Sequence, residues 1–249
     1  LNLVSYNSGD DHFDMAEGYT GLIQYVIAYQ TRTVIPRPGL GNVSSDPQGI
    51  ENDGCNGSNC INGQTSLPYT VPMIANFTLV GPPASVTNSS GNIGMMLRRG
   101  TGGVYVNGVV ARWSRAGISL RDQTTLDRIA DGNLILRNIL VTETPVVFQA
   151  QSGSTVQGTV DLGTNAIEYA AATTATSVVL GVPVGEPANG AVLDGEPTAT
   201  SAAAGGGLAA FTGPIAAKAA QVVSPTIYRG ATGTGSAKWW QGWTYFAVN

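Results

Sequence analysis

The sequence predicts an all-β protein, a right-handed parallel β-helix whose three-strand coils have a period of about 22–23 along the chain. The first observation behind this prediction is a recurring phrase in which an amide residue precedes a short apolar run. The phrase recurs from Asn2 to Gln24, and later at two equal, longer intervals, from Asn76 to Asn107 and from Asn107 to Asn138. Regular self-similarity of this kind indicates stacked repeats rather than a fold with one unique core.

The second observation is a shorter apolar phrase that lies between the amide phrases and recurs at the short interval from Met95 to Ile118. Both kinds of segment are too short for helices and are bounded by Gly, Asn and Asp, as strands are. One coil cannot bury its own apolar face, so neighbouring coils are expected to stack around a continuous core. The handedness rule for parallel crossovers then makes the solenoid right-handed.

The amide residues are expected to form a ladder where each coil bends. Asn tolerates the left-handed backbone that a tight bend requires, and stacked Asn side chains can hydrogen-bond for about 1 kcal/mol each. Gln24 interrupts the Asn series, because Gln favours this backbone less. The predicted ladder consists of Asn2, Gln24, Asn76, Asn107 and Asn138.

The chain is expected to form a single domain with two parts. Residues 1–150 form the parallel β-helix core, with long loop insertions at 31–72, 81–93 and 122–132 and one strand, 49–54, inside the first of these.

Residues 151–249 contribute final strands, then an irregular wrapping segment rich in Ala, Thr and Gly, and then an aromatic C-terminal cap. A short helix is expected near 215–222 within the wrapping segment. The tail contains Trp239, Trp240 and Trp243. Such a concentration of tryptophan seals the end of the solenoid or forms a contact surface for a glycan or a protein partner.

Composition limits the possible partners. Only 11% of the residues are charged, the formal net charge is −4, and there is no basic patch, which argues against nucleic acid as a partner. No apolar run reaches the length of about 18 residues that indicates a membrane-spanning helix, so no transmembrane segment is expected. Abundant Gly, Ser, Thr and Asn suggest an extracytoplasmic β protein rich in turns.

The two cysteines, Cys55 and Cys60, stand at the ends of the segment CNGSNC. No second cysteine pair or nearby histidine completes a tetrahedral metal site, so a local disulfide is expected. A disulfide implies an oxidising compartment. The alternative is two free thiols on a surface loop.

Residues 9–18, GDDHFDMAEG, concentrate acidic side chains in a chain that is otherwise nearly free of charge. If Phe13 and Met15 point inward, strand alternation places Asp14 outward, beside Glu51 on the next coil. Two like charges so close are unfavourable unless a cation neutralises them. A calcium site is therefore one hypothesis, with Asp10, Asp11, Asp14, Glu17 and Glu51 as ligands. The alternatives are that these carboxylates cap turns or meet solvent, or that they take part in catalysis; His12 is expected to be solvated.

Alignment of the strand phrases also places Asp53 beside Arg98, and Arg98 beside Arg121. Asp53 and Arg98 are expected to form a favourable cross-strand pair. In a calcium-dependent lyase acting on uronates, an arginine would abstract a proton, and Arg98, Arg99 and Arg121 are the candidates. The simpler interpretation is that these arginines pair with neighbouring carboxylates and that no residue is catalytic.

An ordered set of motifs resembles a known group of proteins. The set runs GDDxFDxxxGYTG, GIE, NFTLVGP, LRRGT and finally YRGA with GWT. These motifs are similar to those of bacterial secreted or lipoprotein-type proteins of unassigned function, with a right-handed parallel β-helix of pectate-lyase-like architecture. The resemblance covers most of residues 1–148 and 225–246 and carries no catalytic residues. It implies the fold and an extracytoplasmic location, in the periplasm or on the outer surface of a bacterium.

Two functions follow as hypotheses. The first is a non-catalytic structural or binding protein, a rigid subunit that braces a larger periplasmic or cell-envelope assembly through contacts with other proteins. It requires no cofactor, with Ca²⁺ as the exception if the acidic stretch binds it. The alternative is a carbohydrate-active module that binds polysaccharide or cleaves uronates. Within the repeats, aromatic residues are scattered, which favours the first hypothesis.

Overall fold

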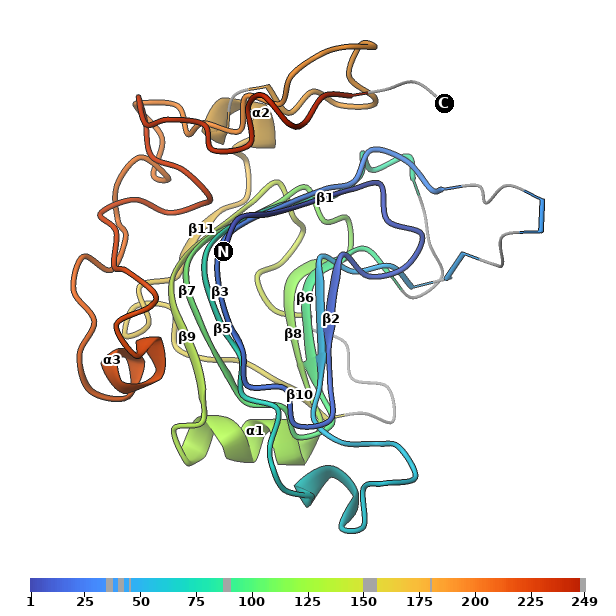
Figure 1. Ribbon diagram of the computed structural model, residues 1–249, viewed down its shortest axis with the longest axis vertical. Coiled ribbons are helices and arrows are strands. Elements are labelled where there is room, and N and C mark those ends of the chain that lie inside the picture. The colour runs from blue at the N-terminus through green and yellow to red at the C-terminus, as the bar shows by residue number, and fades with distance from the viewer. Residues whose placement is uncertain are drawn as a thin grey trace.

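The computed structural model describes residues 1–34, 38–39, 43–44, 46–86, 91–149, 156–179 and 181–246. Two β-sheets face each other across the core (Figure 1). One has six strands in the order β1-β3-β5-β7-β9-β11, and the other has five in the order β10-β8-β6-β4-β2. From β1 to β11, successive strands alternate between the two sheets, so each crossing starts a new strand beside an earlier one.

The six-stranded sheet consists of β1 (Leu3–Tyr6), β3 (Leu22–Tyr29), β5 (Met73–Val80), β7 (Gly103–Ala111), β9 (Leu134–Thr142) and β11 (Glu168–Ala170). The five-stranded sheet consists of β2 (Phe13–Met15), β4 (Ile50–Asp53), β6 (Ile93–Arg98), β8 (Ala116–Arg121) and β10 (Gln157–Gly158). The helices are η1 (Gly63–Thr65, a 3₁₀ turn), α1 (Gln123–Ala130), α2 (Ala175–Val178) and α3 (Gly213–Ala219). Pairing is parallel throughout except between β10 and β8.

The mostly strand content and the parallel pairing agree with the predicted all-β class. Register also follows the repeat, since Met95 of β6 pairs with Ile118 of β8, the two residues that the short interval of the sequence relates. The predicted strand at 49–54 is β4. The prediction of a loop at residues 122–132 is wrong, because residues 123–130 form the helix α1. Its apolar side chains Leu126 and Ile129 pack against the core at helical spacing.

A column of left-handed residues bends the six-stranded sheet. Asn76 on β5, Asn107 on β7 and Asn138 on β9 lie opposite one another, with φ values of 55°, 59° and 54°. Asn2, Tyr25 and Ala166 extend the column at φ of 69°, 65° and 52°. Gln24 is therefore not a member of the backbone column, and Tyr25 takes the position instead.

Gln24 nevertheless contacts the ladder through its side chain. Its Nε2 donates to Asn76 Oδ1 at 3.0 Å and to the Ser224 carbonyl at 2.6 Å. The longer Gln side chain thus reaches the place where an Asn amide would stand, from one position earlier in the strand. The strand pairing is interrupted at the column, since Tyr25 and Asn76, and likewise Asn107 and Asn138, are not paired although the residues on either side of them are. Each long strand of the six-stranded sheet therefore bends at the column.

The main core lies between the two sheets and is built from the inward residues of both. Its largest fully buried members include Phe77, Tyr105, Ile50, Met95 and Trp113. Both faces of the six-stranded sheet are buried, which is typical of parallel sheets. The outward residues on one side of the bend, such as Met73 and Val104, pack against Ile215 and Ala219 of α3.

The C-terminal segment, residues 170–246, covers the outer face of the six-stranded sheet. On the other side of the bend, Ile27, Val80 and Val109 pack against Val178, Leu193 and Trp240 of this segment. Figure 1 shows the segment running along the side of the sheet, where its orange and red trace flanks β7 and β9. The aromatic tail therefore covers a side of the molecule, whereas the sequence suggested an end cap. The helix expected at 215–222 is α3, at residues 213–219.

Candidate functional site

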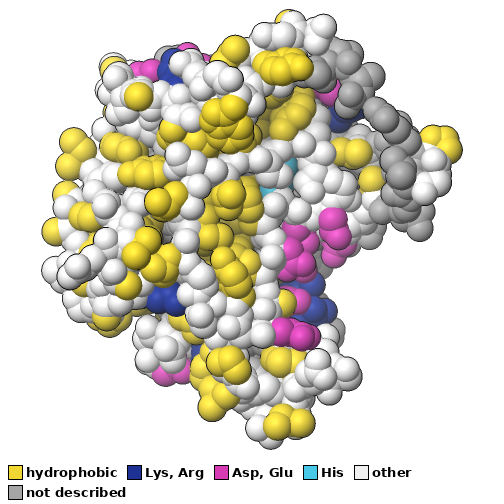
Figure 2. Space-filling model, in the orientation of Figure 1, with side chains coloured by type: hydrophobic (Ala, Val, Ile, Leu, Met, Phe, Trp, Pro, Cys, Tyr) yellow, Lys and Arg dark blue, Asp and Glu magenta, His cyan; other side chains and the backbone are white. Residues whose placement is uncertain are grey.

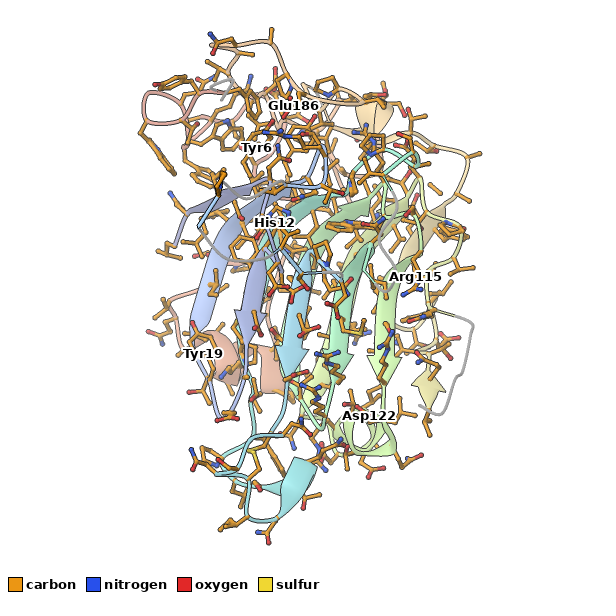
Figure 3. The ribbon with its side chains drawn as sticks, turned by 90° about the vertical axis from the view of Figure 1, so that its right-hand side faces the viewer. Tyr6, His12, Tyr19, Arg115, Asp122 and Glu186 are labelled. Carbon is orange, nitrogen blue, oxygen red and sulfur yellow. A yellow bond between two sulfur atoms is a disulfide. The ribbon has the colours of Figure 1, made fainter. Side chains whose placement is uncertain are left out.

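The outer face of the five-stranded sheet carries a connected group of ion pairs, in which Arg98 and Arg99 pair with Glu51 and Asp53. Figure 2 shows carboxylates and arginines gathered on the flank that this sheet forms, and Figure 3 looks directly onto its strands. Strand alternation puts two rows of polar side chains on this face. One row begins with Asp14 and Glu51, and the other runs from Asp53 through Arg98 to Arg121.

Asp11, Asp14 and Glu51 form an acidic cluster, in which one carboxylate oxygen of each residue lies within 4.8 Å of those of the others. Asp14 and Glu51 face each other across β2 and β4, as the sequence alignment predicts. Asp11 precedes β2, and its Oδ1 accepts a hydrogen bond of 2.6 Å from the Gln48 backbone N–H. Glu51 is buried, Asp11 half-buried and Asp14 exposed, so the cluster opens to solvent on one side.

Burial and mutual repulsion change the acidity of the cluster. Burial, followed by the charge of Glu51, raises the pKa of Asp11 to about 8. Burial likewise raises the pKa of Glu51 to about 7, although Arg98 opposes the change. The pKa of Asp14 is raised for the same main reason. Near neutral pH the cluster therefore holds protons that a cation would displace.

Asp10 and Glu17, the other two residues of the predicted calcium set, do not join this cluster. Asp10 lies on the turn before β2 and acts on Asp11 only through its charge. Glu17 follows β2 in a left-handed turn at φ 49°, and its Oε1 lies beside Gly57 of the neighbouring loop. The predicted set of five thus separates into a cluster of three and two flanking acids.

Two of the three candidate arginines are occupied by carboxylates. Arg98 Nη2 donates to Glu51 at 2.7 Å, and Arg98 Nε donates to Asp53 at 2.7 Å. Arg99 Nη1 also donates to Asp53. Desolvation would lower the pKa of Arg98, but the hydrogen bond and charge of Asp53 outweigh it and raise that pKa. These ion pairs therefore make Arg98 and Arg99 poor candidates for the group that abstracts a proton.

Arg121 differs, because neutral groups hold it. Its Nε donates to Ser119 Oγ at 3.1 Å and its Nη2 to Gln149 Oε1 at 2.9 Å. Within the described residues no ion pair neutralises it. Burial, followed by repulsion from Arg98, lowers its pKa. Arg121 is thus a partly desolvated cation at the opposite edge of the face from the acidic cluster.

His12 is not the solvated side chain that the sequence suggests. Its Nδ1 lies 2.8 Å from Ser5 Oγ, its Nε2 is shielded from solvent, and its ring meets the edge of Trp113. Burial lowers its pKa to about 4. His12 is therefore a neutral structural group where β1 and β2 approach each other.

The three tail tryptophans have different environments. Trp240 is fully buried, and its Nε1 donates to the Leu193 carbonyl at 2.6 Å. Trp239 is half-buried and donates to the Ala231 carbonyl. Trp243 is 58% exposed. Only Trp243 of the three presents a large free surface to a ligand.

Cys55 and Cys60 form a disulfide, with the Cα atoms 5.7 Å apart, as expected. In the part of the chain that the structure describes, no helix combines the length and apolar character needed to cross a bilayer.

Sequence reasoning found most of the charged face but missed its amide and hydroxyl groups. Gln149 and Ser119 position Arg121, and Gln48 fixes Asp11. Ser119 lies on the same strand as Arg121, whereas Gln149 and the Gln48 backbone N–H come from other parts of the chain than their charged partners. The only signal in the sequence is strand register, which would have placed Ser119 two residues before Arg121 on the same face.

Residues 1–181 match the family described as the pectate-lyase like beta helix domain. No curated protein and no solved structure matches the chain. The matched region includes both sheets and every residue of the charged face. The chain therefore belongs to the pectate-lyase-like β-helix domain family.

Proposed function

We propose that the outer face of the five-stranded sheet binds an acidic polysaccharide, a polyuronate, with Ca²⁺ held by Asp11, Asp14 and Glu51. The observation that carries this proposal is the convergence of three carboxylates within 4.8 Å of one another. Among the described residues, fewer than three positively charged side chains pair with these carboxylates. Arg98 contacts only Glu51 of the three and is shared with Asp53. An arrangement of like charges at this distance is unfavourable unless a further cation joins it.

The donor set suits a hard cation. Four of the six carboxylate oxygens accept no hydrogen bond from a described residue, the exceptions being Asp11 Oδ1 and Glu51 Oε2. Calcium takes roughly six to eight oxygen ligands, so these four leave positions for water and for a carboxylate of the ligand. When bound, the cation would attract uronate carboxylates and acidify the proton beside them.

The protein's own contribution at the other edge comes from Arg121. β4 and β8 are two strand spacings apart, about 10 Å, so one extended acidic chain can reach both the cluster and Arg121. Ser119 and Gln149 hold Arg121, and no carboxylate of a described residue forms an ion pair with it, so it can pair with an anion. If the module is a lyase, the lowered pKa of Arg121 suits it better to proton abstraction than Arg98, whose pKa is raised.

Calorimetry with metal-free protein tests this function. We expect Ca²⁺ alone to bind, polygalacturonate to bind in the presence of Ca²⁺, and chelation to abolish the second event. Glu51→Gln should weaken the binding of both Ca²⁺ and polygalacturonate. Asp127 is an exposed carboxylate on α1, and Asp127→Asn should change the binding of neither ligand. Ultraviolet absorbance of unsaturated uronates decides between binding and cleavage. Equal Ca²⁺ affinity in the wild type and the Glu51→Gln variant would remove the basis of the proposal.

A structural function is the second candidate, favoured by apolar surface at the end of the molecule formed by β1 and β2. Leu1 is 67%, Leu3 38% and Tyr19 41% exposed there. Such surface suits a rigid subunit that braces a cell-envelope assembly by contact with other proteins. Stoichiometric co-purification from native envelopes, lost on Tyr19→Lys, would support it. Monomeric recovery of the wild type from the same source would count against it.

The family and the parallel pairing favour a continuous right-handed β-helix in which the bend column divides each long strand into two straight parts, giving three sides per coil. The Cys55–Cys60 disulfide and the family favour an extracytoplasmic location in a bacterium. Blocking free thiols in intact cells before reduction tests the location. Both cysteines should escape the blocking reagent.

A further inference from the structure

The two ends of the described chain together form an aromatic cavity of about 270 Å³. Val4 and Tyr6 of β1 provide one wall, and Trp243, Tyr245 and Phe246 of the tail provide another. The cavity lies on the outer side of β1, away from the five-stranded sheet and its charged face. Residues 243–246 also lie outside the region matched by the family.

The walls are rigid where they touch the core and exposed where they face solvent. The Tyr6 and Phe246 rings meet edge to face at 4.8 Å, and Phe246 also packs near Tyr29. Trp243 Nε1 donates to the Trp239 carbonyl at 2.9 Å, which fixes the plane of its ring. Yet Trp243 is 58% and Tyr245 71% exposed. Aromatic rings that are fixed in place but uncovered lose little conformational entropy on binding.

The lining chemistry identifies the class of ligand. Among the described residues, no charged side chain lines the cavity, so an ionic ligand would find no counter-charge. The lining is nevertheless not purely apolar, because Tyr6, Thr244 and Tyr245 each carry a hydroxyl group, and those of Tyr6 and Thr244 already have partners in Thr31 and the Trp240 carbonyl. The Tyr245 hydroxyl makes no hydrogen bond to a described residue, and an apolar tail or side chain would leave it unpaired.

A neutral pyranose ring meets both requirements, since it has apolar C–H faces and a rim of hydroxyl groups. The volume is just below the range of roughly 300–1,000 Å³ for larger ligands, so the cavity suits one ring of a chain. We propose that this cavity is a binding site for a neutral pyranoside, with Trp243 as the stacking platform and Tyr245 as a hydroxyl partner. The site is independent of the calcium-dependent function proposed for the charged face.

Intrinsic fluorescence and calorimetry with two neutral hexasaccharides, cellohexaose and maltohexaose, test the proposal. At least one should bind and shift the tryptophan emission, and Trp243→Ala should weaken that binding at least tenfold. Tyr245→Phe, which removes only the hydroxyl, should give a smaller loss. Ile227→Ala, a matched change at a residue that is 71% exposed elsewhere, should leave the affinity unchanged. Near-ultraviolet circular dichroism confirms that each variant keeps its tertiary structure.

The same titrations separate this site from the charged face. Chelation of calcium and the Glu51→Gln variant should leave binding of the neutral sugar intact, and hexagalacturonate should not compete for it. The proposal is overturned if neither hexasaccharide binds, or if Trp243→Ala binds as tightly as the wild type. It is overturned as well if a hydrophobic dye binds at Trp243 and neither saccharide displaces it, since that result identifies an apolar protein-docking surface.

Discussion

Arg98 lies directly across from Asp53 on the neighbouring strand, and its guanidinium joins Asp53 and Glu51 through two hydrogen bonds of 2.7 Å. All three side chains are largely withdrawn from solvent, with 10–19% of their side-chain surface exposed. A cation shared in this way holds two carboxylates from the same strand that would otherwise repel each other. The ion pairs therefore contribute to the stability of the face as well as to its charge.

Replacing Arg98 by Met should cost about 2 kcal/mol of unfolding free energy, because Glu51 and Asp53 would stay partly buried and lose their main counter-charge. Urea denaturation at pH 7 without calcium measures the change. The exposed pair of Arg32 and Glu186, with side chains 45% and 43% exposed, is the control. Arg32→Met should cost less than about 0.5 kcal/mol. Equal losses from the two variants would contradict the structural role of Arg98.

Stability of the metal-free protein should fall as pH rises between 6.5 and 8. The folded-state pKa values of Asp11 and Glu51 are raised, to about 8 and about 7, so the folded protein holds protons that the unfolded chain releases. Their protonation therefore stabilises the fold at low pH, and this contribution is lost as pH rises through the folded-state values. We expect a loss of about 2 kcal/mol, smaller than the shifts alone imply because water reaches the cluster.

Asp11→Asn should flatten this pH dependence, since Asn keeps an oxygen for the Gln48 N–H but cannot ionise. Added calcium should restore stability at pH 8 and have little effect at pH 5, where protons compete with it. Thermal unfolding across this pH range provides the measurement. A stability that rises from pH 6.5 to 8 without calcium would show that the cluster is not desolvated as the structure indicates.

His12 should act in the opposite direction at lower pH. Burial lowers its folded-state pKa to about 4, so the unfolded chain takes up a proton first as pH falls below 6.5. Its neutral form therefore contributes stability above pH 6.5 that is lost towards pH 4, partly offsetting the gain from Asp11 and Glu51. His12→Asn should make the fall in stability with rising pH steeper between pH 4 and 6.5. An unchanged slope would indicate that His12 is solvated, as the sequence alone suggests.

Strand register explains why part of this site is predictable from the sequence. Asp14 beside Glu51 and Asp53 beside Arg98 follow from aligning short strand phrases, because side-chain direction alternates with a period of two. The same logic fails at Tyr25, since nothing in the identity of a tyrosine signals a left-handed residue. That conformation is imposed by its neighbours Asn2 and Asn76 in the column.

Contacts between distant parts of the chain are the other limit. The tail tryptophans carry no periodic pattern that says which surface they cover, and Trp240 reaches Leu193 and the six-stranded sheet only through tertiary packing. Helix α1 had a weak signal, the spacing of Leu126 and Ile129. The polar residues around Leu126 and Ile129 obscure this spacing, so the sequence predicts a loop there.

The bend column gives a test that distinguishes backbone strain from hydrogen bonding. Asn107 accepts a bond of 2.6 Å from the Leu208 N–H and donates towards Thr226, at φ 59°. Asn107→Ala loses both bonds and strains the backbone, so we expect a cost of about 3 kcal/mol. Asn107→Gly keeps the backbone conformation accessible and should cost about 1–2 kcal/mol.

Ala166 is the matched control in the same column, because it adopts φ 52° without a side chain suited to it. Ala166→Gly should stabilise the protein by about 0.5 kcal/mol, the relief of strain being partly offset by a more flexible unfolded chain. Chemical denaturation of the three variants ranks them. If Asn107→Gly and Asn107→Ala cost the same, the left-handed conformation contributes nothing measurable at this position.

Trp240 should anchor the whole C-terminal segment to the six-stranded sheet. It is fully buried among the side chains that cover the outer face of the sheet, and its Nε1 donates to Leu193 within the same segment. Trp240→Ala would leave a large cavity and an unpaired carbonyl, so we expect a loss of about 4 kcal/mol. Because these contacts belong to the covering segment, cleavage by a protease should begin within residues 170–246 while the two sheets remain resistant.

The exposed Trp243 is the control, and Trp243→Ala should cost less than about 1 kcal/mol and leave the cleavage rate unchanged. Cleavage of Trp240→Ala that begins in the sheets instead would show that the segment is held mainly by the contacts of α3 with Met73 and Val104.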